Sequence, residues 1–102
     1  MAKYVLTWKY GQGTAQAKHE NVKSLLAAFD KWEEPINQAW LEFVQRVDGQ
    51  GGLAVVETDN PAGLHAEVVK FMTWAEFEVI PVLDIAISVP LVQRGVEYRE
   101  SV

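Results

Sequence analysis

Residues 47–61, VDGQGGLAVVETDNP, constrain the fold more than any other part of the chain. Residues 48–52 (DGQGG) tolerate positive φ, as a tight turn between two strands requires. Residues 53–57 follow with little polar interruption, which is typical of a central strand. Asn60 and Pro61 then give the N-cap and first-turn signature of a helix. The segment therefore predicts an antiparallel hairpin whose second strand leads directly into a helix.

The rest of the chain also shows the periodicities of strands and helices. Residues 3–9 and 76–83 alternate as strands, and residues 39–48 alternate as the first strand of the hairpin. Thr14 is the expected N-cap of a first helix. The apolar positions of this helix, at three- and four-residue steps, are Val22, Leu25, Leu26, Phe29 and Trp32. Those of the second helix are Leu64, Val68, Phe71 and Met72.

The C-terminal segment predicts one more helix. Asp84 is expected to cap a short turn that ends at Ile87, and Pro90 to open a final amphipathic helix. The order is then βαββαβ with an extra C-terminal helix, which is the α+β, ferredoxin-like plan. A chain of 102 residues supports a single domain, 1–102. Whether the last helix covers its own subunit or reaches a partner stays open.

Composition excludes several classes of partner. The net charge of −5 repels both a phosphate backbone and an anionic membrane surface. The absence of cysteine excludes disulfides, thiolate nucleophiles and cysteine zinc sites. The start of the chain lacks a signal-peptide pattern, and no apolar run has the length of a membrane span. We therefore expect a cytoplasmic protein without nucleic-acid or membrane partners.

The predicted sheet has one face that its own helices leave bare. Both long helices of this plan cover the same side, which we expect to carry Leu41, Phe43, Ala54, Val56, Phe77 and Val79. The opposite face is then Val5, Thr7, Trp40, Glu42, Val44, Arg46, Leu53, Val55, Glu57, Glu78, Ile80 and Val82. Which face of the strand at residues 3–9 points which way stays open. An apolar patch of this size is seldom left in water. The sequence therefore predicts a homodimer through the open sheet face.

Four groups of residues carry a family resemblance. They are Lys3-Tyr4-Val5 with Trp8; Phe43-Val44 with Arg46-Val47-Asp48-Gly49 and Gly51-Gly52; Val56-Glu57-Thr58-Asp59; and Phe77-Glu78-Val79 with Pro81-Val82 and Asp84. Over nearly the whole chain they resemble a bacterial domain-of-unknown-function family of the dimeric α/β-barrel, ferredoxin-like superfamily. The resemblance implies a dimeric α/β barrel, an architecture shared by cofactor-free monooxygenases, haem-degrading and chlorite-related enzymes, isomerases, stress-response proteins and amino-acid sensors. It carries over no catalytic residue, because a fold does not select a chemistry.

Glu57 and Glu78 are the candidate catalytic residues. Both are expected on the open face, on strands that lie close in the usual strand order, and two neighbouring carboxylates can divide into a general acid and a general base. The alternative is structural, with Glu57 in a salt bridge to Arg46 or Lys9 or at a solvated strand end.

The tryptophans suggest a ligand site. Trp8 and Trp40, both on strands, could wall a pocket for a planar ligand, or could fill the core and the dimer seam. The expected ligand-binding set is Thr7, Trp8, Trp40, Arg46, Glu57 and Glu78. His19 and His65 lie on the two helices in no metal-binding spacing, so we expect surface or packing roles, no metal site and no cofactor.

Three functional hypotheses follow. The first is a homodimer that binds a small apolar or aromatic molecule in a sheet-lined cavity. The second is a cofactor-independent monooxygenase or isomerase. In it, Glu57 or Glu78 is the general base, and Trp8 or Trp40 forms the aromatic wall of the active site. The third is a structural module whose function is dimerisation itself. Whether the protein is an enzyme stays open at this stage.

Overall fold

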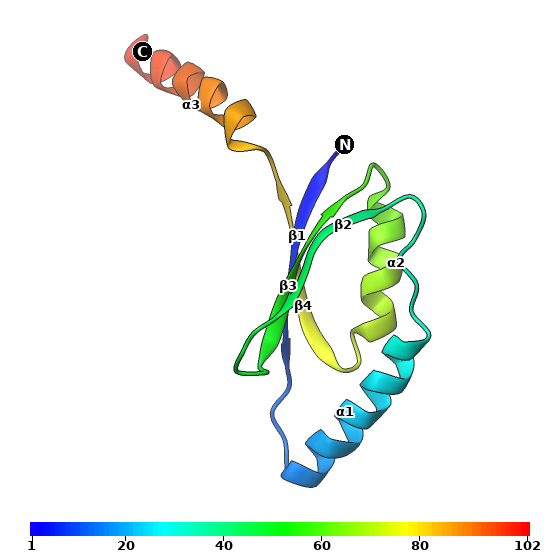
Figure 1. The fold of residues 1–102 in the computed structure, drawn as a ribbon. Helices are drawn as coiled ribbons and strands as arrows, with labels where there is room; N and C mark the ends of the chain where they lie inside the picture. Colours follow the sequence, from blue (N-terminus) through cyan, green and yellow to red (C-terminus); the bar gives the residue numbers. More distant parts are fainter.

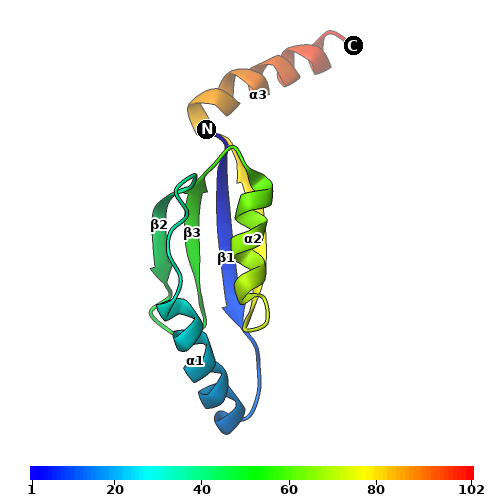
Figure 2. The ribbon, with the colours of Figure 1, turned by 90° about the vertical axis from the view of Figure 1, so that its right-hand side faces the viewer.

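The computed structural model describes residues 1–102 and shows the predicted element order. The elements are β1 (Lys3–Tyr10), α1 (Ala15–Asp30), β2 (Ala39–Gln45), β3 (Gly51–Glu57), α2 (Pro61–Phe71), β4 (Ala75–Val82) and α3 (Ile85–Glu100). The strands form one antiparallel sheet in the order β2-β3-β1-β4 (Figures 1 and 2). The α+β class and the ferredoxin-like plan with an extra C-terminal helix are therefore confirmed.

Local signals in the sequence placed the hairpin and two helix starts. Gly49 has a φ of 72° in the turn between β2 and β3, a conformation that glycine adopts without strain. The Thr14 hydroxyl accepts a hydrogen bond from the Ala17 amide at 3.1 Å, which caps α1. The Asn60 side chain accepts one from the Gly63 amide at 3.1 Å, which caps α2. The turn lies earlier in the chain than predicted, at residues 46–50, since β2 ends at Gln45 and β3 begins at Gly51.

The core is small and lies between α2 and the two central strands. Leu6, Ala54, Val56 and Leu64 form its fully buried cluster, and Tyr4, Trp8, Trp40 and Val68 pack against it. Only 10 of the 102 residues are buried. The radius of gyration is 17.9 Å, whereas a compact domain of this length has about 13 Å. The chain therefore leaves an unusual amount of apolar surface without cover of its own.

Helix α1 covers the sheet only in part. Figures 1 and 2 show α1 and α2 on the same side of the sheet, with the first turns of α1 extending past the sheet's end. No residue of α1 is buried, and its Val22 and Leu26 are 52% and 63% exposed. The prediction that this helix buries its whole apolar stripe was wrong. Only the C-terminal half of the helix lies over the strands.

Helix α3 begins earlier than predicted. It starts at Ile85 and runs through Pro90, although proline removes one backbone donor and is unfavourable inside a helix. The backbone carbonyl of Asp84 accepts from the Ile87 and Ser88 amides at 2.9 and 3.1 Å. Asp84 therefore begins the helix through its backbone, while its carboxylate makes no cap hydrogen bond. None of the helices has the length and apolar content needed to cross a bilayer.

A β-bulge corrects the predicted faces of β2. Trp40 lies opposite Val56 and Glu42 lies opposite Val55, so one extra residue interrupts the alternation between them. Because cross-strand partners share a face, Trp40 points toward the helices with Val56. The prediction that Trp40 lies on the open face was wrong. Leu41, which was predicted to face the helices, is the extra residue of the bulge and has no cross-strand partner.

The pairing of β1 with β3 and β4 confirms most of the residues that were predicted on the open face. Thr7 pairs with both Leu53 and Glu78, and Val5 pairs with both Val55 and Ile80. These residues alternate with the helix-facing Leu6, so they lie on the side opposite α1 and α2.

Gly52 makes room for the indole of Trp8. A Cβ atom built on Gly52 would collide with the Trp8 ring and with the Val44 carbonyl oxygen. The two residues are cross-strand partners, so the indole lies flat over β3 only because no side chain opposes it. The glycine thereby sets the position of a ring that also lines the site described below.

Gly52→Ala is expected to lower the free energy of unfolding by about 2 kcal/mol, because the added methyl overpacks the space beside Trp8. Urea denaturation measures this change. Gly11→Ala is the control, since an added Cβ there meets nothing within 4 Å, and its effect should stay within about 0.5 kcal/mol. Equal stabilities of the two variants would contradict the packing role of Gly52.

Candidate functional site

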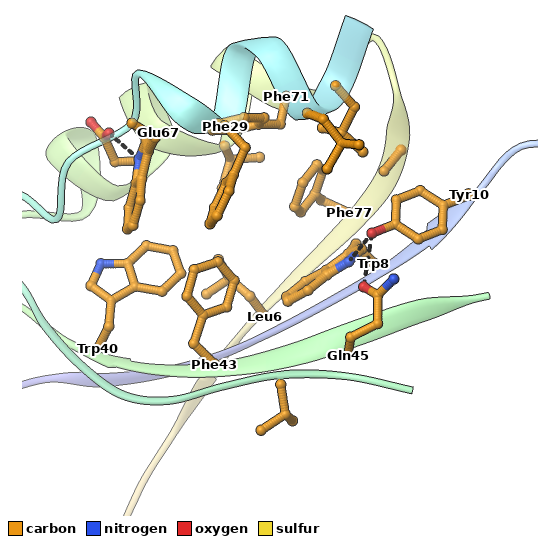
Figure 3. A pocket seen from close by; sticks show the side chains of 16 residues that line it. Leu6, Trp8, Tyr10, Phe29, Trp40, Phe43, Gln45, Glu67, Phe71 and Phe77 are labelled. Carbon is orange, nitrogen blue, oxygen red and sulfur yellow. Dashed lines mark hydrogen bonds between the residues drawn. The ribbon is translucent and has the colours of Figure 1, made fainter. Parts of the chain in front are cut away.

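A pocket of about 350 Å³ lies between the sheet and the two helices α1 and α2 (Figure 3). The sheet contributes Leu6, Trp8, Trp40, Phe43 and Phe77. The helices and the turn after α1 contribute Leu25, Leu26, Phe29, Trp32 and Phe71. Fourteen of its 16 lining residues are hydrophobic, so we call it the aromatic pocket. Its volume and apolar lining fall in the range of small-molecule sites.

The rings of the aromatic pocket hold one another in place. Trp40 and Phe43 have centroids 5.0 Å apart, and Trp32 meets Trp40 edge to face at 5.2 Å. Phe43 also meets Trp8 and Phe29 edge to face, at 5.7 and 5.9 Å. These arrangements are favourable for aromatic pairs and fix the orientation of each ring. Phe43 therefore links the strand wall of the pocket to its helix wall.

Two indole N–H groups are held at the rim of the pocket. Trp40 Nε1 donates to Gln38 Oε1 at 3.0 Å, and Trp32 Nε1 donates to Glu67 Oε1 at 3.0 Å. The same Glu67 oxygen accepts from Lys70 Nζ at 2.8 Å. Glu67 lines the pocket, and Figure 3 shows its carboxylate at one edge of it. The ring faces are therefore left free of polar groups.

Glu67 is a residue that the sequence analysis missed. It is 9% exposed, an unusual burial for a carboxylate, and its hydrogen bonds to Trp32 and Lys70 compensate for that burial. The available signal was its position, since Glu67 falls three residues after Leu64 and four before Phe71 on the apolar stripe of α2. A charge on such a stripe needs partners, and here they are the Lys70 ammonium and the indole N–H of Trp32.

The other end of the pocket is polar. Trp8 Nε1 donates to the Tyr10 hydroxyl at 3.3 Å, and that hydroxyl donates to Gln45 Oε1 at 2.9 Å. Figure 3 shows this chain of hydrogen bonds at one edge of the pocket, across from Trp40. Tyr10 and Gln45 thus offer a hydroxyl and an exposed amide beside an otherwise apolar cavity.

The six predicted ligand-binding residues divide among three places. Trp8 and Trp40 lie in the aromatic pocket, on the helix-covered side. Thr7, Arg46 and Glu78 line a shallow polar depression of about 520 Å³ on the open face, which the Trp8 residue also borders. Glu57 lines neither of these hollows.

Glu57 and Glu78 do not form a pair. Glu57 lies opposite Lys3 on β1, whereas Glu78 lies opposite Thr7. The two positions are four residues apart on the same strand, which corresponds to about 13 Å. Strands β3 and β4 both pair with β1, but the register places Glu57 and Glu78 opposite β1 residues that are four positions apart. The expectation that the two carboxylates lie near each other was therefore wrong.

Lys3 holds an ion cluster at the end of the sheet where α3 begins. Its ammonium lies 3.9 Å from a Glu57 oxygen and donates to Asp84 Oδ1 at 2.7 Å. Glu57 therefore has Lys3 as its partner, and not Arg46 or Lys9. The hydrogen bond from Lys3 holds the pKa of the Asp84 carboxyl below its ordinary value of 3.8. The same bond raises the pKa of Lys3 above 10.5.

The two histidines are exposed. His19 lies in α1 and His65 in α2, and neither lines the aromatic pocket.

Comparison with known proteins identifies a family. The sequence model of a family described as "Domain of unknown function (DUF3303)" matches residues 2–96, which is almost the whole chain. No curated protein matches the sequence.

Asp84 is expected to titrate below pH 3.8 in the folded protein, and Lys3→Met is expected to return its pKa toward that value. Because folding lowers this pKa, the ion pair contributes stability above pH 3.8 and loses it as the pH falls through the folded-state value. Folding raises the pKa of Lys3, so its contribution is present below pH 10.5 and is lost at more alkaline pH. Carboxyl NMR titration measures the shift.

Lys9→Met is the control, since Lys9 lies on the same strand without contact to Asp84. It should leave the Asp84 titration unchanged. An identical Asp84 pKa in the wild type and in Lys3→Met would contradict the ion pair.

Proposed function

The chain belongs to the DUF3303 family, and we propose that it acts as a homodimer whose subunits each bind a small, flat, apolar or aromatic molecule in the aromatic pocket. The observation that carries this proposal is the pocket itself, with its 350 Å³ of space between packed aromatic rings. The proposed cavity lies between the sheet and the helices of one subunit. It replaces the cavity between two sheets that the sequence suggested, because Trp8 and Trp40 face the helices.

The chemistry of the pocket favours a ligand that is mostly apolar. Trp32 and Trp40 direct their N–H groups to Glu67 and Gln38 at the rim, so a bound molecule meets ring faces and aliphatic side chains. Such a ligand gains affinity by losing contact with water and by stacking on the rings. One polar substituent could lie at the Tyr10 end, where the hydroxyl provides hydrogen-bonding capacity.

The open sheet face supports the dimer. Val44, Leu53 and Ile80 lie on it with exposed fractions of 50%, 36% and 43%. Around them the depression carries charges of both signs, from Lys9, Arg46, Glu76 and Glu78. A twofold axis brings a surface against a copy of itself, so a face that carries both signs can pair with its own copy. The apolar centre and the mixed charges both favour a second copy of this chain as the partner.

The pocket gives no support to catalysis by a sheet carboxylate. Glu57 is paired with Lys3, and neither Glu57 nor Glu78 lines the aromatic pocket. The purely structural alternative, in which dimerisation is the whole function, differs from our proposal in predicting no ligand binding. The first experiment below separates these two possibilities.

N-phenyl-1-naphthylamine, a neutral aromatic probe that fluoresces in apolar surroundings, is expected to bind the wild-type protein. Leu26→Glu should weaken this binding about tenfold, because it places a carboxylate in the wall of an apolar site. Val22→Glu is the matched control: it lies one turn earlier on α1, is similarly exposed, and does not line the pocket. Fluorescence titration measures the affinities. Equal affinities of both variants, or no probe binding, would remove the pocket as the ligand site.

Sedimentation equilibrium is expected to give twice the monomer mass of 11.5 kDa. Ile80→Lys should raise the dimer dissociation constant at least tenfold, at a cost of about 1.4 kcal/mol or more, because it places a charge in the apolar centre of the interface. Val79→Lys is the control, since its exposed fraction is 42% against 43% for Ile80 and it points to the helix side. An 11.5 kDa particle at every concentration would contradict the dimer.

A further inference from the structure

We propose that α3 is an exchanged arm, which in the dimer packs its apolar side on the second copy of the chain and not on its own subunit. This inference rests on the proposed homodimer and adds a second contact to it. It also answers the question that the sequence left open about the C-terminal helix.

Helix α3 carries exposed apolar residues, with one continuous stripe among them, and has no cover from its own chain. None of its residues is buried. Ile85, Val89, Val92 and Val96 follow one another at steps of four, three and four residues, so they form one stripe along the helix. Their exposed fractions are 76%, 46%, 60% and 39%. An apolar stripe of this length, left in water along a whole helix, indicates a missing partner.

The direction of α3 identifies that partner as a copy on the open face. Figure 1 shows α1 and α2 on one side of the sheet and α3 beyond the sheet's end, inclined toward the other side. Figure 2, viewed from the helix side, also shows α3 clear of the sheet. A second copy seated on the open face would therefore lie beside α3, whereas the subunit's own helices lie away from it.

The link to the sheet holds α3 in this direction. Only Leu83 and Asp84 separate the end of β4 from the first residue of α3. Asp84 is tied to β1 by the 2.7 Å hydrogen bond from Lys3, and its carbonyl accepts hydrogen bonds from the Ile87 and Ser88 amides in the first turn of the helix. An arm that is already ordered in the free chain loses less conformational entropy when a partner covers it.

The areas involved favour a combined interface. Four strands of seven or eight residues present a flat face of about 500 Å², whereas a standard interface buries about 800 Å² on each partner. One side of a 16-residue helix adds about 240 Å². The sheet face alone is thus at the small end for a stable dimer, and α3 brings the contact into the usual range.

Substitution on the two sides of α3 tests the arm in the full chain. Val92→Lys should raise the dimer dissociation constant at least tenfold in sedimentation equilibrium, because Val92 lies on the apolar stripe. Gln93→Lys is the matched control, since the neighbouring residue points to the polar side with Arg94 and Glu97, and it should change the constant less than twofold. Equal effects of the two substitutions would overturn the proposal.

A spin label shows directly which subunit the arm contacts. The chain has no cysteine, so Gln93→Cys provides a single site for a nitroxide. This labelled chain is mixed with wild-type chain carrying ¹⁵N, and NMR signals of the wild-type sheet should broaden in the mixed dimer. The reverse experiment, in which the labelled chain also carries ¹⁵N and is diluted with excess unlabelled wild type, should show weaker broadening of its own sheet.

The possible outcomes test the exchanged arm and the dimer separately. Broadening across subunits supports the exchanged arm. A dimer of twice 11.5 kDa without such broadening overturns the arm and leaves the sheet interface intact. Strong broadening within the labelled subunit alone overturns the arm as well. A monomer at all concentrations overturns both the dimer and the arm.

Discussion

The central constraint on this protein is that its sheet has two apolar faces and its own helices cover only part of one. Helix α2 supplies Leu64 to the single buried cluster, while α1 reaches the sheet with its C-terminal half and α3 does not reach it. The hydrophobic effect favours removal of the remaining apolar surface from water. The uncovered space under α1 is the aromatic pocket, and the uncovered open face is the surface that we assign to a second copy.

Two departures from regular strand structure shape the pocket. The bulge between Trp40 and Glu42 turns Trp40 toward the helices, where it meets Trp32 and Phe43. Gly52 leaves room for the Trp8 ring on the neighbouring strand. A regular β2 and a larger residue at position 52 would have removed one wall and displaced another. The pocket therefore depends on backbone details as much as on the number of aromatic residues.

Polar contacts in this chain are placed at the margins of the apolar regions. Glu67 is held at the rim by Trp32 and Lys70, and the Tyr10 hydroxyl lies between Trp8 and Gln45. The interior of the pocket then lacks groups that compete with an apolar ligand for hydrogen bonds. At the far end of the sheet, the Lys3 cluster joins β1, β3 and the start of α3, so the ion pair ties the start of a helix to the sheet.

The sequence by itself determined the elements that depend on neighbouring residues. Gly49 in the hairpin turn and the Thr14 and Asn60 caps act within a few positions of the chain, and each was predicted correctly. The open face of β3 and β4 was predicted correctly because alternation is regular there, whereas only the register of β1 with both strands decided which β1 residues lie on it. Trp40 was misplaced because a bulge leaves no clear signal in a single sequence. Glu57 was assigned the wrong ionic partner because the strand register was not known.

Only the tertiary structure decided the contacts between distant positions. The hydrogen bond from Lys3 to Asp84 spans 81 residues, and the bond from Trp32 to Glu67 spans 35. Pairs at such separations depend on the strand register and on where α1 lies, and neither is fixed by local propensity. The sequence thus determined which segments are helices and strands. The packing of those segments decided that Trp8, Trp32 and Trp40 line a pocket within one subunit and that α3 extends away from the sheet.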